Sequence, residues 1–265
     1  MFGFIRTTKE KMTRKIVIHP TFRHLEKDII RILDGNYTAD VTFRNQRNTV
    51  EKITLQEYGI VVKKYRCPNI TNRFAYTHLR KSKAQRAYEY ALRLIDHGVE
   101  TPFPVAYCEE KRNGIFHTGY FLSLYMPYDT LSDAYAGDIG EEMMPVLTRQ
   151  FMDFTIGLNR KRILHKDFNS SNILYHYDPK EQKYRFALTD INRMRFGKRI
   201  STSEAMHSFE QLGVPAERIY RLALYYSQQI GVDIEYTMFV FLFHRIWQRI
   251  RKGFKSKARE KLKMQ

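Results

Sequence analysis

The chain has 265 residues, of which 45 are Lys or Arg and 28 are Asp or Glu, so its formal net charge is +17. Hydrophobic residues make up 43% and aromatic residues 14%, which excludes a disordered chain and suffices for a buried core. Cys67 and Cys108 are too few for a disulfide framework. The longest nearly apolar run, 236–243, is far shorter than the about 20 residues that cross a bilayer. We therefore expect a folded, soluble, intracellular protein.

The N-terminal part is predicted to be rich in strands. Residues 37–43 and 53–65 are enriched in Val, Ile, Thr and Tyr and are separated by a polar break at 45–48. Ser82 is placed to cap a helix whose apolar residues recur at helical spacing until Gly98 ends it. This part is therefore expected to be a β-sheet with one long helix.

Further along the chain, strands give way to helices after Pro127. Two more strands, 105–109 and 120–125, are expected on either side of a hairpin at Asn113-Gly114. Helical periodicity over 141–160 contains Pro145, which predicts either a late start or a proline in the first turn. The remaining predictions are short strands at 173–175 and 184–189 and helices from 203 onward.

These elements predict an α+β chain of two lobes and a tail. The β-rich N-terminal lobe is expected over 1–126, a helical C-terminal lobe over 127–240, and a basic tail over 241–265. Neither internal repeats nor a Gly/Ser-rich linker is visible in the sequence.

The most informative segment contains His165, Asp167 and Asn172. A His-x-Asp followed five residues later by Asn, and then by a short apolar strand, has the spacing of the catalytic loop of kinases. In that loop the Asp takes the proton of the acceptor hydroxyl, the Asn faces a metal ion that bridges the ATP phosphates, and the His braces the loop. The alternative is a capped loop in which Asp167 and Asn172 bond to backbone groups.

A second carboxylate lies at the expected distance. Asp190 ends the apolar segment 186–189, and a kinase needs a carboxylate at such a strand end to hold the catalytic metal. Together with the loop upstream, this favours Asp190 as a metal ligand over an ordinary strand-terminating Asp.

A cation for the ATP phosphates is predicted on the strand that contains Lys63 and Lys64. Side chains alternate along a strand, so one of the two faces the nucleotide; we favour Lys63, with Lys64 the alternative. Glu89 on the following helix is the candidate acid to pair with this Lys. The alternatives are solvent-facing lysines and an exposed helix Glu.

Several protein-kinase motifs are missing from the sequence. A Gly-x-Gly-x-x-Gly loop is absent, leaving the segments 34–37 and 44–48 as candidates to cover the phosphates. Ile191-Asn192 stands where Phe-Gly would follow the metal Asp, and no Ala-Pro-Glu follows. These departures argue against an ordinary protein kinase.

The chain resembles the lipopolysaccharide kinase family, whose members include Kdo (3-deoxy-D-manno-octulosonic acid) and inner-core heptose kinases. The resemblance covers roughly residues 60–195. It is carried by Val62-Lys63-Lys64-Tyr65-Arg66, by the Ser-Lys-Ala helix that runs into Gly98-Val99-Glu100-Thr101-Pro102, by the His-Lys-Asp loop, and by Asp190-Ile191-Asn192-Arg193.

The resemblance implies a protein-kinase-like fold and transfer of the γ-phosphate of ATP, with Mg²⁺, to a sugar hydroxyl of lipid A–core. It implies Asp167 as base, Asn172 and Asp190 as metal ligands, and Lys63 as phosphate clamp. It also implies a cytoplasmic enzyme, peripheral at the inner membrane. Asn192 stands where many members have Asp or His and receives no role, and Glu89 lies about two residues from where some members place the helix acid.

The charge distribution fits an acidic acceptor at an acidic membrane. From Arg245 to Lys263 there are nine Lys or Arg against one acid, Glu260, a net of +8. Ile246, Trp247, Ile250 and Phe254 lie among Arg245, Arg249, Arg251 and Lys252, which predicts a basic amphipathic helix on anionic membrane. Packing of the apolar residues on the lobe is the alternative. Arg193 and Arg195 are candidates for acceptor phosphates or for structural ion pairs.

Three other functions are considered. A kinase of this fold that acts on a protein or on a small molecule would have the same loop. The missing activation segment argues against a protein substrate, and the basic tail argues against a small soluble drug as substrate. A pseudokinase scaffold usually lacks the Asp, Asn or Lys that are all present here. An RNA-binding module would use the basic surface, but no RNA-binding signature is visible, so no specific nucleic acid is expected.

Overall fold

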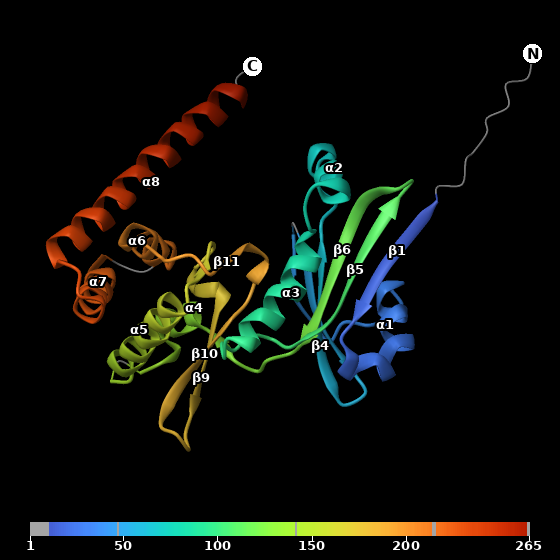
Figure 1. The fold of residues 1–265 in the computed structure, drawn as a ribbon, viewed down its shortest axis with the longest axis horizontal. Coiled ribbons are helices and arrows are strands. Elements are labelled where there is room, and N and C mark those ends of the chain that lie inside the picture. The colour runs from blue at the N-terminus through green and yellow to red at the C-terminus, as the bar shows by residue number, and fades with distance from the viewer. Residues whose placement is uncertain (1–10, 47, 141, 214–215, 264–265) are drawn as a thin grey trace, which may run out of the picture. The chain divides into compact units, whose positions relative to one another are not determined.

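The computed structural model describes residues 11–46, 48–140, 142–213 and 216–263 (Figure 1). The chain forms two compact units, Met1–Pro127 and Tyr128–Gln265. The boundary predicted from the sequence lies one residue earlier, after residue 126. Each unit has its own sheet and helices and is described by itself.

The first unit is built on one antiparallel sheet of six strands in the order β1-β5-β6-β4-β3-β2 (Figure 1). The strands are β1 (Met12–Ile18), β2 (Val41–Asn45), β3 (Asn48–Leu55), β4 (Tyr58–Tyr65), β5 (Pro104–Arg112) and β6 (Ile115–Leu124). The β-rich N-terminal lobe is thus confirmed.

One face of this sheet is covered by the short helix η1 (Pro20–Leu25) and by α1 (Glu26–Leu33). Phe22 and Ile29 are buried there together with Ile60 of β4. No helix is predicted from the sequence in this segment, so the structure corrects the prediction here. The buried apolar residues of α1 recur at i, i+3 and i+4, the spacing of a helix that buries one side.

The opposite face carries α2 (Ile70–His78) and α3 (Lys83–Asp96), and α3 packs on β5 and β6 (Figure 1). The Ser82 hydroxyl accepts a 3.1 Å hydrogen bond from the Gln85 backbone N–H, which confirms the predicted cap. A Cβ on Gly119 of β6 would lie 3.0 Å from the Cβ of Ala84, so glycine allows the close approach of helix and sheet. The helix α2 was not predicted, and none of its residues is buried.

Of two turns between neighbouring strands, the sequence predicts one and misses the other. Asn113-Gly114 forms the predicted hairpin, with positive φ at both residues. The single strand predicted over 53–65 is wrong, because β3 and β4 are joined by a turn at Gln56 and Glu57. Gln56 has φ 54°, and without a Gly, Pro or Asn the sequence gives no signal for that turn.

The second unit is mainly helical and has two small sheets, β10-β9-β7 and β11-β8. Its elements are β7 (Asp129–Thr130), α4 (Leu131–Asp133), η2 (Ala134–Asp138), α5 (Met144–Arg160), β8 (Ile163–His165), η3 (Ser170–Asn172), β9 (Ile173–Asp178), β10 (Lys183–Leu188), η4 (Ile191–Arg193), β11 (Met194–Phe196), α6 (Thr202–Gln211), α7 (Ala216–Ile230) and α8 (Ile234–Lys263). Pro145 lies in the first turn of α5, where its missing N–H costs no helical bond.

The core of the second unit connects its helices with the strands that flank the predicted catalytic loop. Phe151 of α5 is fully buried and contacts Phe168 of the loop and Phe186 of β10. The helix α8 packs against α6 and α7 and starts before residue 241, where the tail was predicted to begin. None of the described helices is both long and apolar enough to cross a membrane.

Candidate active site

His165 holds the predicted catalytic loop by two hydrogen bonds. Its side chain is 2% exposed at the end of β8. Nδ1 accepts a 3.1 Å bond from the backbone N–H of Asp167, and Nε2 lies 3.0 Å from the carbonyl oxygen of Thr189. Because Nδ1 is the acceptor, Nε2 carries the proton and donates to Thr189. The ring therefore ties the loop to the end of β10.

Two hydrogen bonds of Asn172 complete a closed circuit with those of His165. Its Nδ2 donates to the carbonyl oxygen of Asp167 at 2.9 Å, and its own carbonyl oxygen accepts from the backbone N–H of Thr189 at 2.9 Å. His165, Asp167, Asn172 and Thr189 are thus linked in a closed circuit. The circuit fixes the backbone positions from which Asp167 and the neighbouring Asp190 project.

Asp190 takes a backbone conformation that is unusual for a residue other than glycine. Its φ and ψ are 49° and 40°, in the left-handed region, and Asn192 Nδ2 donates to its Oδ1 at 2.5 Å. Asn192 is 6% exposed. The sequence alone predicts no role for Asn192; in the structure its amide orients the carboxylate of Asp190. Its spacing, two residues after the Asp, was the signal that was available.

A second residue that sequence reasoning missed supports the loop from α6. Gln211 Oε1 accepts a 2.8 Å bond from the backbone N–H of Phe168, and its Nε2 lies 2.9 Å from His207 Nε2. No local pattern connects residue 211 with the loop, since 43 positions separate it from Phe168.

The donor set of this region suits a hard cation. Mg²⁺ prefers oxygen ligands and is usually held by one or two carboxylates together with waters and phosphate oxygens. The Asn172 amide donates through Nδ2 to Asp167, so its Oδ1 is the atom left for a ligand, and Asp190 supplies a carboxylate. These residues fit such an ion, and the described residues contain no cluster of three or more His, Cys, Asp or Glu side chains that would make a separate metal site.

In the first unit, Lys63 and Lys64 lie on opposite faces of the sheet. Lys64 shares a face with Ile60 and Val62, which are buried under α1, and its Nζ lies 5.4 Å from the centre of the Tyr120 ring. Lys63 lies on the face that carries α3, with Nζ 5.4 Å from the Tyr65 ring. A lysine that acts with an acid of the helix must lie on the helix side, so the geometry favours Lys63.

Glu89 lies on α3 and is held by its own helix. Its carboxylate accepts from Lys81 Nζ at 2.7 Å and from Gln85 Nε2 at 3.0 Å, and the Glu89 interaction raises the pKa of Lys81. In this structure the carboxylate is thus bound by Lys81 and Gln85 and not by Lys63. A role for Glu89 as the partner of Lys63 stays a prediction.

Arg195 has a structural role in the second unit. Its guanidinium binds both carboxylate oxygens of Glu204, the residue that forms the capping box of α6 with Ser201. The Arg195 hydrogen bonds, followed by those from Ser201, lower the pKa of Glu204 to about 2. Of the two arginines proposed for acceptor phosphates, Arg195 is therefore engaged in a structural pair, whereas the Arg193 side chain is exposed.

The two segments proposed to cover the phosphates have ordinary turn roles in the structure. Gly35 follows the last turn of α1 with φ 81°, and its backbone N–H bonds to Ile32. The segment 44–48 contains the turn between β2 and β3, and residue 47 lies outside the described residues.

Taken together, the two units have the residues that the kinase class of phosphotransferases uses: a strand lysine on the side of the sheet that carries a helix, a braced His-x-Asp loop, and an Asn and an Asp on the same hydrogen-bonded frame. The pattern of the lipopolysaccharide kinase (Kdo/WaaP) family matches residues 22–222, and the chain belongs to this family.

A solved structure described as WaaP in complex with acyl carrier protein has a similar fold. It is 15% identical in sequence, with a TM-score of 0.58, and the match covers 91% of this chain and 98% of that chain. At this identity the match supports the fold, and it confirms the kinase-like α+β architecture. No curated protein sequence matches the chain.

Proposed function

We propose that the protein is an ATP-dependent kinase that transfers the γ-phosphate to a sugar hydroxyl of the lipopolysaccharide inner core, on Kdo or heptose. The observation that carries the proposal is the closed hydrogen-bond circuit through His165, Asp167, Asn172 and Thr189. Phosphoryl transfer requires positioning and charge stabilisation more than covalent chemistry, and such a circuit supplies a rigid frame for both.

Each chemical role has a candidate residue or pair of residues. Asp167 accepts the proton of the acceptor hydroxyl and aligns it with the γ-phosphorus. Lys63 binds the α- and β-phosphates as a point charge. Asn172 and Asp190 would hold Mg²⁺, which when bound neutralises charge on the phosphates. Asn192 keeps the carboxylate of Asp190 oriented toward that task.

The basic charge of the chain supports an acidic acceptor. Lipid A bears phosphates and Kdo bears a carboxylate, so a chain with a net charge of +17 attracts this acceptor over distances of a Debye length. The exposed side chain of Arg193, next to the metal-binding segment, is proposed to meet an anionic group of the acceptor.

We propose that α8 binds the anionic cytoplasmic face of the inner membrane. Five large apolar side chains are 45–67% exposed along one stripe of the helix at i, i+3, i+7, i+10 and i+14: Tyr236, Phe239, Phe243, Ile246 and Ile250. Arg249 and Arg251 are exposed beside the stripe. The side chains of Lys252 and Phe254, named in the sequence analysis, lie outside the described residues. Apolar exposure combined with positive charge matches anionic lipid.

The membrane proposal is tested by sedimentation with vesicles of phosphatidylglycerol and phosphatidylcholine. Replacement of Phe239 and Ile246 by Ser should reduce binding to the anionic vesicles at least tenfold, whereas the same change at Ile115 and Val146, which are also exposed, should not. Equal binding to vesicles of phosphatidylcholine alone would contradict a charge-dependent role. Concentration-dependent self-association without vesicle binding would assign the stripe to a second copy of the chain.

A second partner is suggested by the solved neighbour, whose description names acyl carrier protein. The second unit has a cavity of about 980 Å³ whose lining includes the apolar residues Ile139 and Met152 and the basic residues Arg149, Arg218 and Arg221. Such a cavity suits an apolar chain with an anionic attachment. We therefore propose that this chain also binds an acyl carrier protein, which co-elution of the purified proteins on gel filtration would test.

The central experiment measures transfer of label from γ-labelled ATP, with Mg²⁺, to purified Kdo–lipid A and to heptose-containing core. The proposal expects label on one glycolipid, lost in Asp167→Asn and kept in Asp178→Asn, a matched change outside the circuit. ATP consumption without labelled glycolipid would redirect the proposal to another acceptor. Neither label nor ATP consumption in the folded protein would overturn the kinase activity.

A further inference from the structure

The last residue of α6, Gln211, bonds to the catalytic loop in one orientation of its amide. Its Oε1 accepts a 2.8 Å hydrogen bond from the backbone N–H of Phe168. A backbone N–H can only donate, so the oxygen end of the amide must face the loop. The nitrogen end then faces His207, one turn earlier on the helix, whose Nε2 lies 2.9 Å from Gln211 Nε2.

This second contact requires a neutral His207. The Gln211 amide nitrogen only donates, so His207 Nε2 must be the acceptor and must carry no proton. The single proton of the neutral imidazole is therefore on Nδ1. When His207 takes up a second proton, both ring nitrogens become donors, and two N–H groups point at each other across 2.9 Å. The contact then changes from a hydrogen bond to a repulsion.

Rotation of the Gln211 amide does not relieve this repulsion. Half a turn of the amide brings Oε1 to the charged imidazole, but it also brings the amide nitrogen to the Phe168 N–H, where two donors meet again. The charged form of His207 and the bond from Phe168 to Gln211 therefore exclude each other. Protonation of one side chain on α6 thus releases one backbone group of the catalytic loop.

The released N–H belongs to the peptide group that directly follows the proposed base. The carbonyl oxygen of this group, from Asp167, accepts from Asn172 Nδ2 at 2.9 Å, and its N–H, from Phe168, donates to Gln211. Side chains therefore hold the peptide group on both sides. Release of the N–H lets the group tilt, which moves the carboxylate of Asp167. Because phosphoryl transfer depends on positioning, such a displacement lowers its rate.

The helix α8 packs on α6 and brings a second histidine to His207 (Figure 1). The His244 ring lies 5.3 Å from the His207 ring, and His244 Nε2 lies 2.8 Å from Ser203 Oγ. Burial, followed by His207, lowers the pKa of His244, so the two rings oppose each other's charge. The two histidines must therefore be tested separately.

The other charged groups come from the elements around His207. On α6 itself, Glu204 is bound by Arg195, and Glu210 lies three residues after His207. The neighbouring elements contribute Arg245 on α8, Arg218 and Arg221 on α7, and Lys166 and Asp167 in the loop. Within the described part of the chain none of these groups makes a hydrogen bond with His207. The change in hydrogen bonding on protonation therefore falls on Gln211.

We propose that His207 is a positioning residue for the catalytic loop: its neutral form orients Gln211, and its protonation releases the peptide group after Asp167 and lowers the rate of phosphate transfer. The effect on transfer rests on the proposed kinase function. The release of the Phe168 N–H does not depend on any activity, so the test has a structural and a kinetic readout.

The structural readout is the amide signal of Phe168 in NMR spectra of the full chain labelled with ¹⁵N-phenylalanine. The signal is assigned by its loss in Phe168→Leu. In the wild type the amide proton should shift upfield between pH 8 and pH 5, because its hydrogen bond is lost. The shift should be absent in His207→Gln, whose side-chain oxygen accepts from Gln211 and does not titrate in this range. A wild-type signal that does not move would overturn the proposal, whether or not the chain is a kinase.

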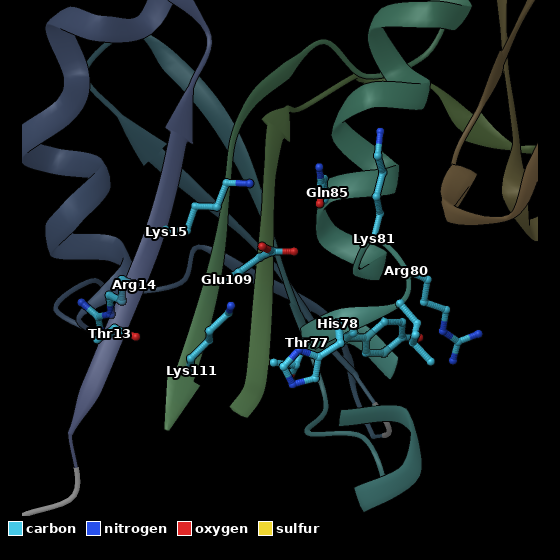
Figure 2. Close-up of a pocket in the computed structure, with 12 residues that line it drawn as sticks. Thr13, Arg14, Lys15, Thr77, His78, Arg80, Lys81, Gln85, Glu109 and Lys111 are labelled. Carbon is cyan, nitrogen blue, oxygen red and sulfur yellow. The ribbon is translucent and has the colours of Figure 1, made fainter. Parts of the chain in front are cut away.

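Two other histidine variants are the controls for this shift. His78 is an exposed residue of α2 in the first unit, where it lines a pocket (Figure 2), so His78→Gln should keep the shift. His244→Gln should keep it as well, because the contact with Gln211 comes from His207. Loss of the shift in either control would overturn the role of His207.

The kinetic readout is the ratio of phosphate transfer at pH 7.5 to that at pH 5.5. Gln211→Glu supplies a carboxylate that accepts from both the Phe168 N–H and the charged His207, which removes the incompatibility. The ratio should be at least about fivefold smaller in Gln211→Glu and in His207→Gln than in the wild type and His78→Gln, the scale of one lost hydrogen bond. Equal ratios in the four proteins would overturn the positioning role. Absence of transfer in all of them would refute the kinase function, and the Phe168 signal would still decide whether His207 controls the loop.

Discussion

Replacement of His165 by Phe tests whether the hydrogen-bond circuit stabilises the loop. Phe fills the space of the 2%-exposed imidazole but can make neither the 3.1 Å bond with the Asp167 N–H nor the 3.0 Å bond with the Thr189 carbonyl oxygen. A hydrogen bond contributes about 1 kcal/mol net, and a buried group left without a partner costs about 1–3 kcal/mol. Two such groups predict a loss of about 2–4 kcal/mol in the free energy of unfolding.

The loss is measured by urea titration followed by circular dichroism, with His176→Phe as the control. His176 is exposed on β9 and stacks on Tyr128, a contact that Phe keeps, so its replacement should change stability by less than about 0.5 kcal/mol. Turnover of the folded His165→Phe protein should also fall at least tenfold, since Asp167 loses its support. A variant as stable and as active as the wild type would refute the circuit as the element that positions Asp167.

Three further predictions follow from contacts in the second unit. Asn192→Ala removes the hydrogen-bond donor to Asp190. Because loss of an orienting residue weakens metal binding, the Mg²⁺ concentration needed for half-maximal turnover should rise about tenfold. An unchanged Mg²⁺ dependence would exclude this role of Asn192. Glu204, whose pKa is lowered to about 2, stabilises the folded state above pH 4.5, and this contribution is lost as the pH falls toward 2. After allowance for solvent screening, Glu204→Gln should therefore cost about 1–2 kcal/mol at pH 7 and nothing near pH 2, whereas the exposed Glu181→Gln should show no such trend. Burial, followed by the nearby His207, lowers the pKa of His244. Because the unfolded state then takes up the proton at a higher pH than the folded state, the free energy of unfolding should fall as the pH drops below 6.5. The variant His244→Gln should flatten this decline, as measured by urea titrations at pH 7 and pH 5.

The parts of the fold with local signals were predictable from the sequence. The cap at Ser82, the turn at Asn113-Gly114 and the proline at the start of α5 each depend on one or two residues whose preferences decide the backbone. The helix α1 and the turn at Gln56 were not predicted. The three buried apolar residues of α1 form too short a pattern, and Gln56 takes its left-handed φ because of the register between β3 and β4.

The candidate site likewise has features that the sequence predicts and features that depend on tertiary packing. The spacing of His165, Asp167 and Asn172 is local, and the structure places all three in one circuit. The supporting role of Gln211 depends on tertiary packing, since α6 must pack beside the loop before its amide reaches Phe168. The choice between Lys63 and Lys64 also required the structure. The alternation of side chains along a strand shows that the two lysines lie on opposite faces of the sheet, but not which face carries α3.

The most direct test of the central claim is a comparison of turnover and ATP affinity in the wild type and Asp167→Asn. Asparagine keeps the size of the side chain but cannot take the proton of the acceptor hydroxyl, and the backbone bonds of residue 167 to His165 and Asn172 remain available. We predict that phosphate transfer to the lipopolysaccharide acceptor falls at least a hundredfold, the scale of general base catalysis, while Mg²⁺-dependent ATP binding stays within about threefold. Transfer at the wild-type rate by Asp167→Asn would contradict the assignment of this loop as the catalytic site.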